Sequence, residues 1–228
     1  MPSPTTPISI HHPLTRRQLG SWSASTIVTT AGFSPWTLAQ GKPPEEGLDY
    51  AKLDKLVATE APKGKVEVVE FFWYHCPHCY RFEPTLQAWL KKLPHHVHFR
   101  RVHVAFRPDF VFDQKLFYTL EAMGKVEQMH SRVFAAIHAE KLDLGSREKI
   151  IEWAAKQGID KTKFSDIYDS FAIGSKATRA TQLQTAYNVS GVPALGIAGQ
   201  FYTDGAMAQS MERALQITDY LIATQRKK

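Results

Sequence analysis

The only two cysteines of this 228-residue chain are Cys76 and Cys79, which lie in the stretch VVEFFWYHCPHCY at residues 68–80. A pair with this C-x-x-C spacing can supply half of a zinc site, close a small structural disulfide or exchange disulfides with other proteins. A structural zinc site commonly needs a second cysteine pair or a pair of histidines, and the chain has no second cysteine pair. The spacing therefore favours redox chemistry, in which the thiolate is the reactive species.

Histidines near the pair keep a zinc site open as an alternative. Those along the strand predicted to follow are interpreted as a solvated face of that strand, and not as metal ligands. The histidines in question are His75, His78, His95, His96, His98 and His103.

The residues on either side of Cys76 predict a strand that leads into a helix. Residues 65–74, KVEVVEFFWY, are rich in valine and aromatics and predict a strand buried on both faces. From Cys76 the apolar residues change to helical spacing, and the helix is expected to kink at Pro84 and to stop at Pro94.

This placement gives the two thiols different environments. Cys76 is expected at the exposed N-terminus of the helix, where free amides and the helix dipole stabilise a thiolate, and Cys79 one turn inside, where it is shielded. Pro77 suits the first turn, which needs no amide donor. His78 can add charge or a hydrogen bond at the Cys76 sulfur.

Glu70 and Pro193 are further candidates for the site. Glu70 lies in the same apolar strand, and it is either a strand-edge carboxylate in water or a partly buried proton acceptor for Cys79, with a pKa raised by desolvation. In SGVPALGI, Val192 and Pro193 precede a short apolar strand, and their X-Pro bond is either an ordinary trans linkage in a loop or a fixed cis turn facing the cysteines.

The remaining pattern predicts an α/β core that is interrupted by helices. Residues 97–106 alternate like a strand, and residues 108–173 show only helical spacing. The last part predicts a helix over residues 174–188, two strands around a turn over residues 189–205, and a closing helix over residues 211–224. Residues 41–50, which are rich in Pro and Gly, are expected to be a mobile or surface lead-in.

Charge and length exclude some classes of protein. The formal net charge is +6, but Lys and Arg are interspersed with Asp and Glu, so a nucleic-acid-binding protein is not expected. Hydrophobic residues make up 43% of the chain, which is enough to bury a core without disulfides. No stretch of the mature chain approaches 18 consecutive apolar residues, so no membrane span is expected.

The first 39 residues predict a cleaved bacterial export signal. They contain no acidic residue, and Arg16 and Arg17 precede a weakly apolar stretch rich in Ser, Thr and Ala that ends at small residues. TRRQL is similar to a twin-arginine signal, although a Sec signal with a long polar leader is an alternative. Export would place the C-x-x-C pair in an oxidising compartment, where it can cycle through a disulfide.

The strand with its motif, EFFWYHCPHCYRFEP, together with GVPALGI more than a hundred residues later, closely resembles the DsbA family of periplasmic thiol:disulfide oxidoreductases. The resemblance extends over about residues 48–225. It implies a thioredoxin-like fold, with core residues 40–106 and 174–228 and an inserted helical domain at residues 107–173. The departures from the family pattern are Trp73, Tyr74 and His75, directly before the motif.

The resemblance also implies roles for the candidate residues. Cys76 matches the nucleophile, Cys79 the resolving thiol and His78 the histidine that makes the pair oxidising. Glu70 matches the acid beneath the site, and Val192 with Pro193 the loop that docks substrate.

The same resemblance implies the partners and the location. The redox-active disulfide of Cys76 and Cys79 would be the only cofactor, with no metal. The expected partners are unfolded exported proteins with free thiols and a quinone-linked membrane oxidase of the DsbB type. A periplasmic monomer is expected.

Two other functions remain as alternatives. A disulfide isomerase or reductase of the same fold would use the same cysteines at a different redox poise. A binding protein with a structural disulfide would leave Cys76 inert to thiol reagents after reduction.

Overall fold

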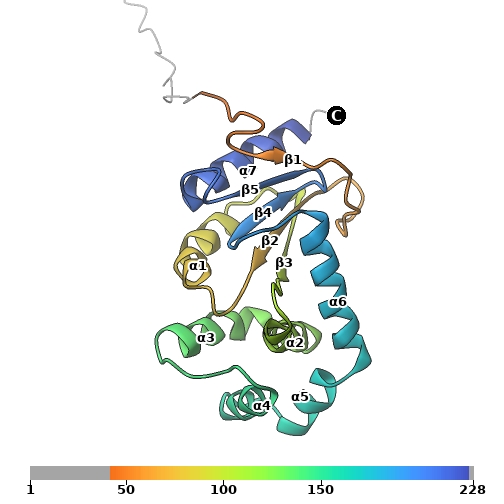
Figure 1. Cartoon of the computed structure of the whole chain (residues 1–228), viewed down its shortest axis with the longest axis vertical. Helices are drawn as coiled ribbons and strands as arrows, with labels where there is room; N and C mark the ends of the chain where they lie inside the picture. The colour runs from red at the N-terminus through yellow and green to blue at the C-terminus, as the bar shows by residue number, and fades with distance from the viewer. Residues whose placement is uncertain (1–41, 226–228) are drawn as a thin grey trace, which may run out of the picture. The chain divides into compact units, whose positions relative to one another are not determined.

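The computed structural model describes residues 42–225, which form a mixed sheet with helices on both of its faces and beyond one end (Figure 1). Within these residues the sheet has five strands in the order β1-β5-β4-β2-β3. Only β2 and β3 run parallel, and the other neighbours are antiparallel. The strands are β1 (Ala51–Lys52), β2 (Val66–Phe72), β3 (Val97–His103), β4 (Ala194–Ile197) and β5 (Phe201–Asp204).

The helices of the described residues divide into three that flank the sheet and a block, of one short 3-10 helix and four α-helices, that lies beyond it (Figure 1). The flanking helices are α1 (Pro77–Leu90), α6 (Phe171–Ala186) and α7 (Met211–Gln225). The block consists of the short helix η1 (Pro108–Phe110), then α2 (Val111–Ala122), α3 (Val126–His138), α4 (Arg147–Lys156) and α5 (Lys161–Tyr168). This arrangement is the thioredoxin-like fold with inserted helices that the sequence predicts.

Strand β2 is buried because it lies between β3 and β4 and is covered on both faces. Val68 packs with α1 and α7 on one face, where Leu86 and Leu221 belong to the same apolar cluster. On the other face Phe71 contacts Tyr187, which follows α6, at a ring centroid distance of 5.1 Å. The prediction of a strand buried on both faces is confirmed.

The helical block is joined to the end of β2 through aromatic packing. Phe72 packs edge-on against Phe117 of α2 and against Tyr74, each at a centroid distance of 5.1 Å. Phe134 of α3 lies 5.2 Å from Tyr74. Edge-to-face packing of this kind adds to the energy of burial, so the residues just before Cys76 are held by the block as well as by the sheet.

Several element boundaries differ from those expected. Strand β3 ends at His103, and α1 continues through Pro84 but ends at Leu90. Helix α6 begins at Phe171, because the side chain of Ser170 caps it by accepting a hydrogen bond from the Ile173 amide.

The described part of the lead-in, residues 42–50, is mostly exposed, as expected for a segment on the surface, and it continues into β1, which pairs with β5 through Ala51 and Tyr202. The expected export signal, residues 1–39, lies outside the described residues. Within the described part of the chain, no helix has both the length and the apolar character needed to cross a membrane.

Candidate active site

Cys76 is the residue that caps helix α1. After β2 the chain turns, with the amide of Cys76 donating to the carbonyl of Trp73 at 3.0 Å, and α1 begins at Pro77. Proline fits there because the first helical residue needs no amide donor. The Cys76 sulfur takes the place of a capping oxygen and accepts a hydrogen bond from the Cys79 amide at 3.5 Å.

The two sulfurs are free thiols in this structure and are stabilised in opposite protonation states. The pKa of Cys76 is lowered to about 6, and the largest cause is a hydrogen bond from the Cys79 thiol to the Cys76 sulfur. Burial opposes this effect, whereas the backbone amides of Cys79 and His78 and the charge of His78 lower the pKa further. Burial raises the pKa of Cys79 well above its usual value. Cys76 is 6% exposed and Cys79 1%, so Cys76 is less exposed than expected although it is the more accessible of the two.

The side chain of His78 is exposed and does not hydrogen-bond the Cys76 sulfur. When the ring is neutral, its Nδ1 atom accepts a hydrogen bond from Arg81, one turn further along α1, at 2.9 Å, and the ring carries a charge only when it is protonated. The contribution of His78 at Cys76 therefore comes from its charge and its backbone amide, and not from the hydrogen bond that the sequence analysis considered.

The loop before β4 approaches Cys76 from a distant part of the chain. The peptide bond between Val192 and Pro193 is cis, and the Cys76 thiol donates to the Val192 carbonyl at 3.3 Å. A cleft of about 430 Å³ next to this contact is lined by His78, Val192 and Pro193 together with residues 204–206 and Met211. The expectation of a cis turn facing the cysteines is confirmed.

Glu70 is a buried carboxyl group, so its interpretation as a strand-edge carboxylate in water is wrong. It is 1% exposed, in the middle of β2, directly across from Arg101 of β3. Desolvation raises the pKa of Glu70 to about 8, although Arg101 lies near enough to oppose this. The Arg101 Nε atom is 2.9 Å from Glu70 Oε2, but the two atoms lack hydrogen-bond alignment.

Three other residues of this buried cluster, Arg101, Glu83 and His130, were not found by the sequence analysis. Glu83 of α1 accepts a hydrogen bond from Arg101 at 3.0 Å, and its other oxygen lies 3.4 Å from His130 Nε2 of α3. Burial raises the pKa of Glu83, but His130 and Arg101 outweigh it, so the pKa is lowered. The helical spacing could have placed Glu83 on the buried side of α1, one turn after Cys79, but nothing local to the sequence predicts its partners.

Tyr74, two residues before Cys76, is bound to three histidines. Its amide donates to His103 Nε2 at 3.1 Å, its hydroxyl lies 3.0 Å from His130 Nδ1, and its carbonyl accepts from His138 Nε2 at 2.8 Å. His103 is fully buried, so its interpretation as part of a solvated face is wrong. The sequence analysis missed this role because alternation along β3 does not show that the helical block covers its end.

A second anchoring point is Asp113 near the start of α2. One of its oxygens, Oδ2, lies 2.8 Å from both Trp73 Nε1 and His75 Nδ1. The Trp73 ring stacks on Phe110 at a centroid distance of 3.9 Å. The three residues that depart from the family pattern, at positions 73–75, are therefore all held by the inserted helices or by β3.

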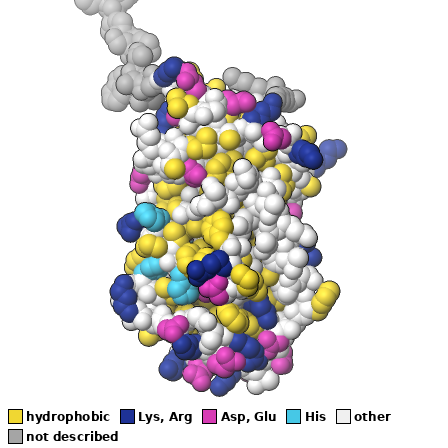
Figure 2. Space-filling model, in the orientation of Figure 1, with side chains coloured by type: hydrophobic (Ala, Val, Ile, Leu, Met, Phe, Trp, Pro, Cys, Tyr) yellow, Lys and Arg dark blue, Asp and Glu magenta, His cyan; other side chains and the backbone are white. Residues whose placement is uncertain are grey.

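Apolar side chains gather over the middle of the face shown in Figure 2, with histidines along one margin. At the start of the helical block, Phe106, Val111 and Phe112 are between 37% and 39% exposed. Since Asp113 ties this end of α2 to His75, these apolar residues belong to the surroundings of the motif.

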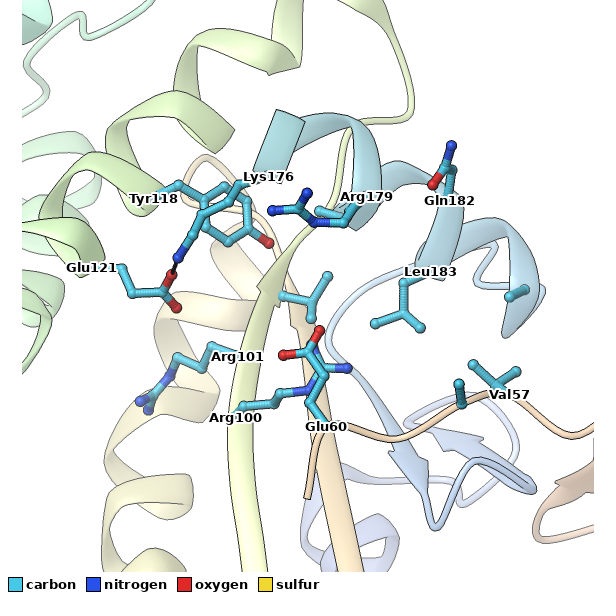
Figure 3. Close-up of a pocket in the computed structure, with 14 residues that line it drawn as sticks. Val57, Glu60, Arg100, Arg101, Tyr118, Glu121, Lys176, Arg179, Gln182 and Leu183 are labelled. Atoms are coloured by element: carbon cyan, nitrogen blue, oxygen red, sulfur yellow. Dashed lines mark hydrogen bonds and ion pairs between the residues drawn. The ribbon is translucent and has the colours of Figure 1, made fainter. Parts of the chain in front are cut away.

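A second hollow, of about 390 Å³, lies beside β3 and α6 and does not include either cysteine (Figure 3). The side chains of Arg100 and Arg101 leave β3 in different directions there. Arg100 pairs with the buried Glu67, and Lys176 pairs with Glu121. Among residues 42–225, no group of three or more histidine, cysteine and carboxylate side chains is arranged to hold a metal ion.

A buried parallel strand that ends in a C-x-x-C motif at a helix N-terminus, with a cis-proline loop against the first sulfur, defines a thioredoxin-fold thiol:disulfide oxidoreductase. Residues 112–216 match the family model of the DSBA-like thioredoxin domain. A Burkholderia cepacia protein named thiol:disulfide interchange protein DsbA is 40% identical over 200 residues, which cover 87% of this chain and 94% of the relative. An Azotobacter vinelandii protein of the same name is 42% identical over 203 residues, 88% of this chain and 94% of the relative.

The crystal structure of Pseudomonas aeruginosa DsbA has a TM-score of 0.76 and 42% identity, over 79% of this chain and 94% of that structure. This chain belongs to the DsbA family. It is a thiol:disulfide interchange protein, an enzyme that exchanges disulfides with the thiols of other proteins.

Proposed function

We propose that this enzyme donates the disulfide between Cys76 and Cys79 to newly exported proteins in the periplasm. The observation that carries the proposal is the contrast between the two sulfurs, one with a lowered pKa at a helix N-terminus and one buried with a raised pKa. A stabilised thiolate is a good leaving group and favours the reduced form, so the oxidised enzyme tends to give its disulfide away.

The exchange takes two steps. The thiolate of a client protein attacks the Cys76 sulfur, the bond to Cys79 breaks, and Cys79 leaves with the electron pair. A second client thiolate then attacks the client sulfur of this mixed disulfide. Cys76 leaves as its stabilised thiolate, and the client carries the new disulfide.

Glu70 supplies the proton that Cys79 needs when it leaves and accepts it again when the enzyme is reoxidised. A carboxyl group with a pKa of about 8 is partly protonated at neutral pH, so it can act in both directions. Its burial beneath the motif, next to Arg101, supports this role.

The client chain docks against Val192 and Pro193. The cleft next to Cys76 is lined by this loop, and the Val192 carbonyl lies 3.3 Å from the sulfur that the client attacks. An extended segment placed there could use its backbone for binding, which suits an enzyme that accepts many sequences.

Membership of the DsbA family supports the following proposal for the surroundings of the enzyme. Residues 1–39 act as an export signal, residues 40–106 and 174–228 form the catalytic core, and residues 107–173 form an inserted helical domain. The enzyme works in the periplasm as a monomer without a metal or an organic cofactor. A quinone-linked membrane oxidase of the DsbB type reoxidises it.

Trapping of clients tests the assignment of the two cysteines. In Cys79→Ser, Cys76 can still form mixed disulfides but the resolving thiol is gone, so disulfide-linked clients are expected to accumulate in cells. Cys76→Ser is the matched control and should trap none. Equal loss of activity in both variants, with no trapped client in either, contradicts the assignment.

A further inference from the structure

His75 stands directly before the nucleophile and has a fixed orientation. Its Nδ1 atom lies 2.8 Å from Asp113 Oδ2, which also accepts a hydrogen bond from Trp73 Nε1. The Asp113 side chain is only 5% exposed, whereas that of His75 is 28% exposed. A buried carboxylate therefore holds one edge of a ring that still reaches solvent.

This contact determines which nitrogen of His75 can exchange a proton. A carboxylate oxygen accepts hydrogen bonds, so Nδ1 of His75 must carry hydrogen in both charge states of the ring. The proton that comes and goes is therefore on Nε2, which has no hydrogen-bond partner among residues 42–225. An imidazole oriented by a carboxylate through one nitrogen, with the other nitrogen free, is an arrangement suited to a general base.

The groups that face His75 come from three elements: Asp113 of α2, Asp143 of the segment after α3, and His103 of β3. Burial lowers the pKa of His75, but the hydrogen bond and charge of Asp113, with the charge of Asp143, outweigh it and raise the pKa. The hydrogen bonds and the charge that lower the pKa of Cys76 come from Cys79 and His78 at the start of α1. The contact of His75 with Asp113 points to a different role for this ring.

We propose that His75, oriented by Asp113, accepts the proton of the client thiol that attacks Cys76. The proposal rests on the function proposed above and adds the proton transfer that precedes the attack of the client sulfur on Cys76. The client S–H bond breaks, the proton moves to His75 Nε2, and the client sulfur keeps the electron pair. That sulfur then attacks Cys76, Cys79 leaves with the electrons of the broken disulfide, and His75 gives its proton to solvent.

The factor by which a base at His75 can accelerate the attack of a thiol has an upper limit, which the experiment can use. A thiol with a pKa of about 8.5 is only about 3% ionised at pH 7, so a base can accelerate its attack by at most about thirtyfold. A thiol that is already ionised gains nothing. The effect of His75 must therefore depend on the pKa of the attacking thiol, whereas a structural or redox effect would act on both thiols alike.

The test is stopped-flow reduction of the oxidised enzyme by two small thiols, an alkyl thiol such as glutathione and the ionised aryl thiol thionitrobenzoate. At pH 7, His75→Gln should react about tenfold more slowly with glutathione and at an unchanged rate with thionitrobenzoate. The deficit should disappear as the pH rises above the pKa of glutathione. The reduction potential should stay unchanged, and His95→Gln, at an exposed histidine elsewhere, should behave as wild type in every assay.

Two further measurements make the result independent of one variant. Asp113→Asn should show the same selective deficit, and added imidazole should restore the glutathione rate of His75→Ala but not its thionitrobenzoate rate. In the wild type, the glutathione rate at pH 7 should exceed the rate calculated from its thiolate fraction and its rate at high pH. The proposal is overturned by equal losses of rate with both thiols or by the absence of this wild-type excess. The rate with thionitrobenzoate reports on disulfide exchange alone, so failure of this proposal can be distinguished from failure of the proposed function.

Discussion

Cys76 and Cys79 lie one helical turn apart, yet their surroundings stabilise opposite protonation states. The sulfur of Cys76 receives hydrogen bonds from the start of α1, whereas burial raises the pKa of Cys79. At neutral pH the pair therefore holds one stable thiolate and one stable thiol. This asymmetry assigns different chemistry to two residues of the same type.

The charge of His78 should contribute a measurable part of the low Cys76 pKa. In His78→Ala that charge is lost, so we expect the Cys76 pKa to rise and the reduction potential to shift in the reducing direction by about 30 mV for each pKa unit. Ultraviolet titration of the thiolate gives the pKa, and equilibrium with glutathione gives the potential. An identical Cys76 titration in wild type and His78→Ala would contradict this role.

Burial of Glu70 should make stability fall as the pH rises. Its pKa is raised from about 4.3 in the unfolded chain to about 8, so the protonated form is favoured by folding. The corresponding stability is complete below pH 4.3 and is lost as the pH rises through 8. Urea unfolding of oxidised protein should therefore show a smaller decline between pH 5 and pH 8.5 in Glu70→Gln than in wild type, and equal declines would show that Glu70 is already ionised at pH 5.

Residues of the site were predictable where the motif is local and unpredictable where partners come from far along the chain. The cysteines, Pro77, His78 and the proline loop were found from sequence and meet at the start of α1, and Glu70 was found as a residue of the strand that leads to them, where it is buried against Arg101. Asp113 and His130 were missed. Each contacts the motif from a helix 30 to 60 residues away, and helical periodicity shows only that such residues lie on a helix, not what they touch.

At the scale of elements, the strand that leads into the motif is held from three sides. Tyr74 is bound by His103 of β3 and by His130 and His138 of α3, and Trp73 and His75 are bound by α2. The inserted helices thus position the segment before the nucleophile directly. This gives the insertion a physical task in addition to covering the end of the sheet.

The contact between β3 and Tyr74 should weaken in acid. Burial lowers the pKa of His103 to about 4, and its Nε2 must be unprotonated to accept the Tyr74 amide. The unfolded chain binds the proton at about pH 6.5, so this group should cost about 3 kcal/mol of stability between pH 6.5 and pH 4. His103→Gln keeps an acceptor but does not titrate, and chemical denaturation across this range should show a shallower decline for it than for wild type.

If both proteins lose stability equally between these pH values, the acid sensitivity does not come from His103. His130, whose pKa burial also lowers, would act with the same sign. The double substitution at both histidines would then separate their contributions.

Most elements could be predicted from the pattern of apolar residues, and the exceptions have physical causes. Strand β1 has only two residues and is defined by its pairing with β5, which leaves no periodic signal. Helix α6 begins three residues before the predicted start because Ser170 caps it and the exposed Phe171 gives no apolar stripe. In both cases a pairing with a distant strand or a capping side chain sets the position of the element, and the spacing of apolar residues does not show it.

At the scale of the whole molecule, the described chain places its reactive sulfur where three parts meet. The end of β2, the helical block and the loop before β4 all reach Cys76 or its neighbours. The thiolate is then linked to the stability of the entire fold, because every group that stabilises it depends on these parts remaining in place. The redox state of the cysteine pair and the free energy of unfolding are therefore thermodynamically linked.

The most direct test of this account is the difference in free energy of unfolding between reduced and oxidised protein, measured from pH 5 to pH 8 by chemical denaturation. The constraint that the disulfide places on the unfolded chain does not depend on pH, so any change in the difference reports the thiols. A depressed thiol pKa contributes stability that is complete above the unfolded value of about 8.5 and is lost as the pH falls through the folded value of about 6. Cys79, with its raised pKa, does not contribute within this range.

We expect the reduced form to gain about 2 to 3 kcal/mol relative to the oxidised form between pH 5 and pH 8. Cys76→Ser forms no disulfide, and its free energy of unfolding, measured over the same range, should lack this gain. A difference that does not change with pH would contradict the account, because the fold would then give Cys76 no stabilised thiolate with which to donate its disulfide.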